Sequence, residues 1–98
     1  MQYLIVAHDG PGMLEKRMSV RPEHLENMKK VNGTVVCAGG ILDENGDLKG
    51  SALVIDFASP ELVDEYLATE PYVREKVWED IRLEPMNVVI LNGEFVGK

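Results

Sequence analysis

Apolar, β-rich segments alternate with helical segments along this chain in an order that few folds can accommodate. Strands are recognised by their enrichment in Val, Ile and Tyr, and helices by apolar residues that recur every three or four positions. These patterns predict strands at residues 2–8, 34–42, 51–58 and 81–91, and helices from about Val20 to the Asn32-Gly33 pair and over residues 59–71. Residues 9–12 and 43–50 are predicted turns, 13–19 a loop, 72–80 a short helical piece and 92–98 a C-terminal tail.

The predicted order β-α-β-β-α-β is that of the ferredoxin-like arrangement. Right-handed crossovers then place both helices on one face of a four-stranded antiparallel sheet, an α+β fold. A chain of 98 residues is expected to form a single domain, residues 1–98. The sequence therefore predicts one layer of helices on one sheet.

The strands are apolar on both of their faces, which such a single layer does not explain. A sheet covered on one face should alternate apolar and polar residues, whereas "YLIVA", "ALVI" and "VVIL" are apolar throughout. No predicted element remains to cover the second face. We therefore expect a homodimer in which two sheets pack face to face as a dimeric α/β barrel.

The charge balance and the single cysteine exclude several kinds of partner and compartment. Seventeen acidic residues against ten basic ones give a net charge of −7, which argues against nucleic acid and against an anionic membrane surface. The one cysteine, Cys37, forms no intrachain disulfide and is expected in the core. No apolar run approaches the roughly 18 residues of a membrane span. These features predict a cytoplasmic protein.

Five of the ten basic residues nevertheless lie within residues 16–30, next to a possible acid–base pair. Asp9 follows the first predicted strand and His24 lies near the start of the following helix, so both are expected at the same edge of the sheet. A carboxylate on one imidazole nitrogen fixes the tautomer and leaves the other nitrogen for a substrate proton. The spacing also allows two separate residues, a solvated histidine and an aspartate that shapes its turn.

Arg17 and Arg21 lie beside this pair and suggest an anionic ligand. Arginine forks suit carboxylate or phenolate oxygens, so the two residues are candidates for an anion-binding rim. Surface ion pairs in an acidic protein are the alternative. Tyr72 is expected either to point its hydroxyl into the same pocket or to lie in the core.

No fingerprint for a nucleotide, flavin or haem is present, so no cofactor is expected. His8 neighbours Asp9, but strand alternation sends its side chain to the opposite face. The spacing of these residues does not match a well-formed metal site, so no metal is expected.

The stretches "YLIVAHD", "LEKRMSVRPEHLENM", "AGG" and "EPYV" together resemble the YCII-related domain family. The resemblance spans roughly residues 2–91, and its most specific part is the run Arg-Pro-x-His-Leu at 21–25 with Asp9 and Arg17. It implies a dimeric α/β barrel with a His24–Asp9 pair in its active site. One branch of the family resembles dehydrochlorinases of chlorinated hydroxyquinols, which implies proton transfer or elimination on a small ring.

The chain departs from the family pattern at one position that bears on the ligand. The family commonly has Asp-Pro-Tyr after the second helix, whereas this chain has Glu70-Pro71-Tyr72. We expect Glu70 and Tyr72 to take part in substrate binding, with a longer reach for the acid. The predicted function is a cofactor-free acid–base enzyme, and the alternatives are a metabolite-binding module on the same pocket and an accessory subunit.

Overall fold

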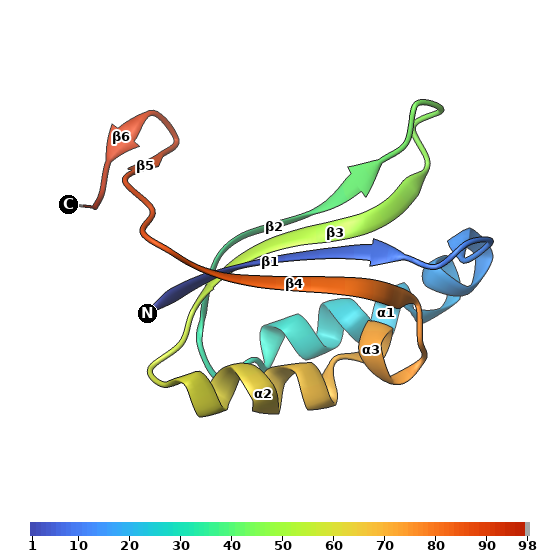
Figure 1. Ribbon diagram of the computed structural model, residues 1–98, viewed down its shortest axis with the longest axis horizontal. Coiled ribbons are helices and arrows are strands. Elements are labelled where there is room, and N and C mark those ends of the chain that lie inside the picture. Colours follow the sequence, from blue (N-terminus) through green and yellow to red (C-terminus); the bar gives the residue numbers. More distant parts are fainter. Residues whose placement is uncertain (98) are drawn as a thin grey trace.

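The computed structural model describes residues 1–97 and shows four strands in one sheet with the helices on one side of it (Figure 1). The sheet is antiparallel with the strand order β2-β3-β1-β4. This is the predicted ferredoxin-like α+β fold, which the structure confirms. The sheet strands are β1 (Gln2–Asp9), β2 (Thr34–Leu42), β3 (Leu48–Asp56) and β4 (Trp78–Met86); the helices are α1 (Leu14–Lys29), α2 (Pro60–Thr69) and α3 (Pro71–Arg74); β5 (Ile90–Leu91) and β6 (Glu94–Phe95) form a separate hairpin.

Helix α1 begins six residues before the predicted start at Val20. The prediction of a loop over residues 13–19 is wrong, because "LEKRMSV" contains neither glycine nor proline and consists mainly of good helix formers. Pro22 consequently lies inside the helix rather than in its first turn. A proline there removes one backbone hydrogen bond. The longer helix brings Arg17, Val20 and His24 onto its buried side.

The C-terminal part also differs from the prediction. The fourth strand is Trp78–Met86 rather than residues 81–91, and the helical piece predicted over 72–80 is limited to α3. Instead of a tail, β5 and β6 form a hairpin whose turn residues Asn92 and Gly93 have φ of 52° and 80°. Positive φ at both central residues is what a tight hairpin turn requires. Residue 98 of the predicted tail lies outside the described residues.

The two faces of the sheet carry different side chains. Ile5, Ala7, Leu53 and Ile55 alternate toward the helices and belong to the core. The opposite face, which we call the open face, carries Leu4, Val6, Ala52 and Val54 on β1 and β3, in mutually paired positions. Figure 1 shows both long helices on the side away from this face. The prediction of two apolar faces therefore applies to the centre of the sheet.

Strand β4 does not share that apolar character. Its residues opposite Leu4 and Val6 are Glu84 and Arg82, so the open face is charged along this edge. The apolar "VVIL" segment, predicted as part of the fourth strand, follows the sheet and leads into β5. Cys37, predicted in the core, is exposed because the bulge between Val35 and Cys37 pairs it with Val54 on the open face. Across residues 1–97, no helix has both the length and the apolar character needed to cross a membrane.

Candidate functional site

A pocket of about 340 Å³ lies between α1 and the β2–β3 side of the sheet. This is at the lower end of the range in which small-molecule sites fall. One wall is cationic and comes from α1, and the opposite wall is apolar and comes from the strands. The lining residues are Arg17, Arg21, His24, Leu25, Met28, Lys29, Val35, Ala38, Gly39, Gly40, Leu48, Ser51, Leu53 and Tyr72.

The hollow arises from a row of small residues across the sheet. Ala7, Ser51 and Gly40 lie side by side on β1, β3 and β2, according to the strand register. Ala7 and Ser51 face the helix side, as do the core residues Ile5 and Leu53 two positions along the same strands. Because none of the three is bulky, α1 does not meet a packed layer here. A Cβ at Gly40 would displace the end of the Leu48 side chain, so glycine at this position helps to keep the row open.

Arg17 lies on one side of the pocket in a charge-neutral group. Its Nη1 donates to both Asp9 carboxylate oxygens at 2.8 and 3.0 Å, and its Nη2 donates to Ser51 Oγ at 2.6 Å. Only 3% of Arg17 is exposed. Burial raises the pKa of the Asp9 carboxyl, while the hydrogen bond and the charge of Arg17 oppose this rise. We call Asp9, Arg17 and Ser51 the Arg17 cluster.

His24 lies in a second group that is centred on a fully buried carboxylate. Its Nδ1 lies 2.7 Å from Glu70 Oε1, and the Tyr66 hydroxyl donates to Glu70 Oε2 at 2.6 Å. Burial and the neighbouring Glu70 charge raise the pKa of the Tyr66 phenol, which keeps it a donor. Glu70 Oε1 also accepts the backbone N–H of Tyr72 at 3.1 Å. We call His24, Tyr66 and Glu70 the His24 cluster.

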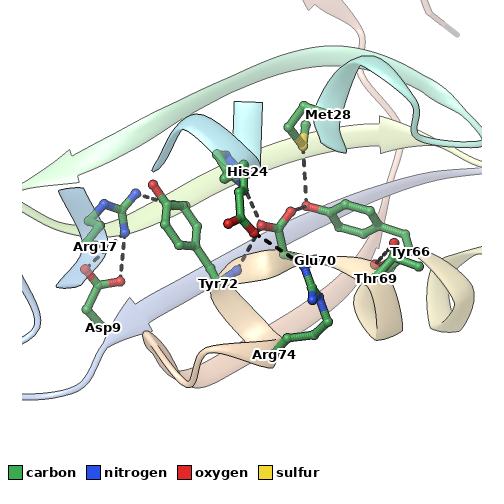
Figure 2. A network of polar contacts seen from close by, with 11 residues as sticks. Asp9, Arg17, His24, Met28, Tyr66, Thr69, Glu70, Tyr72 and Arg74 are labelled. Atoms are coloured by element: carbon green, nitrogen blue, oxygen red, sulfur yellow. Dashed lines mark hydrogen bonds and ion pairs between the residues drawn. The ribbon is translucent and has the colours of Figure 1, made fainter. Parts of the chain in front are cut away.

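The Tyr72 ring separates the two clusters (Figure 2). The imidazole of His24 stacks on it with 4.3 Å between ring centroids, and the Arg17 guanidinium carbon lies 4.6 Å from its centroid. A cation near an aromatic face is attracted by the ring quadrupole. Burial raises the pKa of the Tyr72 phenol, and the charges of Arg17 and Arg21 oppose this rise. The ring therefore fixes the relative position of Arg17 and His24.

The predicted hydrogen bond between His24 and Asp9 is wrong. His24 lies ten residues after the start of α1 rather than near its start. Each of the two residues is bound by another partner: Asp9 by Arg17 and His24 by Glu70. The reason is the early start of α1, which places the Arg17 guanidinium beside Asp9. Nδ1 of His24 instead meets the carboxylate at the end of α2. The catalytic roles of His24 and Asp9 stay predictions.

The other predicted residues divide between the pocket and its support. Arg21 is exposed and lines the pocket, as a rim residue should, whereas Arg17 is buried and neutralised. Tyr72 lines the pocket and is also 99% buried in the core cluster, since only 1% of it is exposed. Glu70 is fully buried and does not line the pocket, so it supports His24 rather than reaching a ligand.

Sequence reasoning missed Ser51 and Tyr66. Ser51 was part of the predicted third strand, and its one signal is a polar residue between small neighbours at the start of an apolar run. Tyr66 lies within the predicted second helix and packs in the core, and its hydroxyl donates to Glu70. Its spacing of four from Glu70 is the signal for that contact, because such residues are neighbours on a helix. Within residues 1–97, no three His, Cys, Asp or Glu side chains are grouped closely enough to hold a metal ion.

The family model of the YCII-related domain matches residues 1–87. The chain belongs to this family. An uncharacterised protein of Haemophilus influenzae and the protein YciI of Escherichia coli are each 33% identical to it in an alignment of 97 positions, which covers 91% of this chain and 99% of either relative. Both are similar to this chain over almost their full length.

A similar solved structure is that of 5-chloro-2-hydroxyhydroquinone dehydrochlorinase from Burkholderia phenoliruptrix, in complex with 2,5-dihydroxybenzoquinone. The TM-score is 0.80 at 22% identity, and the match covers 88% of this chain and 93% of that chain. At this identity the similarity shows a shared fold.

Proposed function

We propose that this protein is an acid–base enzyme that uses His24 for proton transfer or elimination on a small anionic ring. The observation that carries the proposal is the buried Glu70 carboxylate on His24 Nδ1. A carboxylate there favours the tautomer with hydrogen on Nδ1 and leaves the lone pair of Nε2 available. Nε2 is then the atom that accepts a proton from the substrate, and the adjacent Glu70 charge stabilises the imidazolium that forms.

The pocket supports an anionic and partly apolar substrate. Arg21 supplies a positive charge at the rim, while the Arg17 charge is balanced by Asp9. Val35, Ala38 and Leu53 supply an apolar wall. The dehydrochlorinase of the same fold was solved with a hydroxyquinone, which agrees with this combination. An elimination would move one proton from the ring substrate to Nε2 while chloride leaves with the bonding electron pair.

Replacement of the histidine tests this proposal. We expect chloride release from chlorinated hydroxyquinols by the wild-type protein, and a loss of roughly 10²–10⁴ in rate for His24→Ala, the usual contribution of a general acid or base. Ser19→Ala is a matched control, because Ser19 is exposed on α1 and bonds only the Lys16 carbonyl within residues 1–97. Turnover by His24→Ala at the wild-type rate would contradict the catalytic role.

The second candidate function is a binding module that holds the same ligand without turnover. It is favoured by the small size of the pocket and by the stacking of His24 on Tyr72, which are compatible with holding a ligand alone. Calorimetry with 2,5-dihydroxybenzoquinone distinguishes the two functions when combined with product analysis. A module saturates with its ligand and returns it unchanged, whereas an enzyme converts a substrate of the same class.

The open face supports a homodimer, which we include in the proposal. Leu4, Val6 and Val54 form an apolar centre, and Ile90 and Phe95 on the projecting hairpin are 54% and 79% exposed. Stable interfaces generally bury more than roughly 1,000 Å². We expect light scattering to give about twice the chain mass of 10.9 kDa and Val6→Glu to abolish the dimer. A well-behaved wild-type monomer would contradict this.

With a free, exposed Cys37, we place the protein in the reducing cytoplasm.

A further inference from the structure

Ser51 has a hydroxyl hydrogen for which the described residues provide no acceptor. The residue lies on β3, is 3% exposed and lines the pocket. Its Oγ is 2.6 Å from Arg17 Nη2. A guanidinium has donors only, so the oxygen of Ser51 must accept in this bond and its own O–H must point elsewhere.

The surroundings of Ser51 leave the pocket as the place where that hydrogen can be used. Its neighbours across the sheet are Ala7 and Gly40, whose side chains carry no polar atom. Among the hydrogen bonds of residues 1–97, none has Ser51 Oγ as the donor. A buried hydroxyl without an acceptor costs free energy, which a ligand oxygen in the pocket would recover.

We infer that Ser51 is a ligand-binding residue whose hydroxyl donates to an oxygen of the bound molecule. This rests on the proposed function and identifies the part of the substrate that enters the pocket on the Arg17 side. The Asp9–Arg17 ion pair orients the serine, because it fixes the guanidinium that donates a hydrogen bond to Ser51 Oγ. Hydrogen bonds in such a chain polarise one another, so the Arg17 bond makes the serine a stronger donor.

The inference narrows the class of substrate. The acceptor must be an oxygen such as a carbonyl or phenolate, because the Ser51 O–H and the Arg21 guanidinium both offer donors. Ring substrates with an oxygen at the Ser51 end and an exchangeable proton at the His24 end satisfy both clusters. Ammonium groups do not, because they have donors only, would leave the serine hydrogen unpaired and would meet the positive charge of Arg21.

Binding of 2,5-dihydroxybenzoquinone to Ser51 variants tests the inference. We expect Ser51→Ala to weaken the dissociation constant about 10- to 100-fold, the worth of a hydrogen bond to a charged partner. Ser51→Thr keeps the hydroxyl and suits a strand, so it should bind more tightly than Ser51→Ala, and the Ser19→Ala control should bind at the wild-type level. Calorimetry gives the dissociation constants, and circular dichroism verifies the fold.

Vibrational spectra of the bound quinone separate a ligand contact from a structural role. A hydrogen bond to a quinone oxygen lowers its C=O stretching frequency, so the band should move back toward its solution value in Ser51→Ala and not in Ser51→Thr. If Ser51→Ala does not fold, Ser51→Cys takes its place, because a thiol is a weaker donor of similar size.

The outcomes separate this inference from the proposed function. Wild-type binding with an unchanged constant and an unchanged C=O band in Ser51→Ala would overturn the role of Ser51 and leave the function of His24 intact. Absence of binding by the wild-type protein would overturn the proposed pocket and the role of Ser51 with it. Weakened binding together with the band shift supports both.

Discussion

On one side of the Tyr72 ring, the charges of Asp9 and Arg17 cancel; on the other side, a buried carboxylate meets a histidine. Both clusters lie under α1, and both consist of one acid, one base and one hydroxyl. They differ in what the base can do with a proton. Arginine keeps its proton at any ordinary pH, whereas the imidazole of a histidine can both accept and donate one.

This difference indicates a division of labour in the pocket. The Arg17 cluster is a fixed framework that holds Ser51, and its charge does not change during a reaction. The His24 cluster can exchange one proton with a ligand, and Glu70 with Tyr66 holds the ring while it does so. Replacing single members of each cluster should therefore affect stability on one side and proton transfer on the other.

The largest effect on stability is expected for Arg17→Met. The substitution leaves the Asp9 carboxylate partly buried without its partner and should cost about 3–5 kcal/mol in the free energy of unfolding, as broken buried ion pairs do. Urea denaturation measures it. The double variant Asp9→Asn/Arg17→Met should recover part of the loss, because no unpaired charge remains. Equal free energies of unfolding for the wild type and Arg17→Met would show that the Asp9–Arg17 ion pair does not stabilise the fold.

Glu70→Gln should reduce the free energy of unfolding by about 1–3 kcal/mol, since the amide keeps the shape but loses the charge that two donors and His24 share. It should also lower the reaction rate. A double-mutant cycle isolates the pair: the coupling between His24→Ala and Glu70→Gln should be about 0.5–3 kcal/mol. The coupling between His24→Ala and Asp9→Asn should be smaller. A larger coupling to Asp9 would restore the aspartate as the partner of His24.

The smallest expected effect is a loss of stability at alkaline pH. The pKa values of the Tyr66 and Tyr72 phenols are raised in the folded protein, whereas the unfolded value is 10.0. Their contribution is fully present below pH 10 and is lost as the pH rises above it, by at most about 1.4 kcal/mol per pH unit for each group. Urea denaturation at several alkaline pH values measures the slope. Tyr66→Phe should reduce this slope; an unchanged slope would exclude Tyr66 as its source.

The sheet could be predicted from the sequence because its signals are local. Strand β2 has its predicted bounds, and the turn around Gly46 was visible as Asn45-Gly46. The fourth strand was misplaced because "VVIL" has a stronger β propensity than "WEDIRLEPM". The pairing with β1, and not propensity, determines which of the two segments enters the sheet.

The residues of the site could be found from the sequence, but their partners could not. Asp9, Arg17, Arg21 and His24 were all singled out, and all four lie at or beside the pocket. The partner of His24 is 46 positions away on another element, so only the tertiary fold brings them together. The partner of Asp9 depends on where α1 begins. Because residues 13–19 were predicted as a loop, the sequence did not define the position of the Arg17 side chain.

Glu70 Oε1 interacts both with the imidazole of His24 and with the backbone N–H of Tyr72. The Tyr72 amide is therefore sensitive to changes in the imidazole. The same oxygen lies 2.7 Å from His24 Nδ1 and 3.1 Å from the Tyr72 nitrogen. When the imidazole gains a proton, it draws electron density from this oxygen and weakens the bond from the Tyr72 N–H. The amide resonance of Tyr72 should therefore follow the protonation of His24 in a nuclear magnetic resonance titration, without any label on the histidine. The backbone at the α2–α3 junction should thus report a protonation change that takes place on α1.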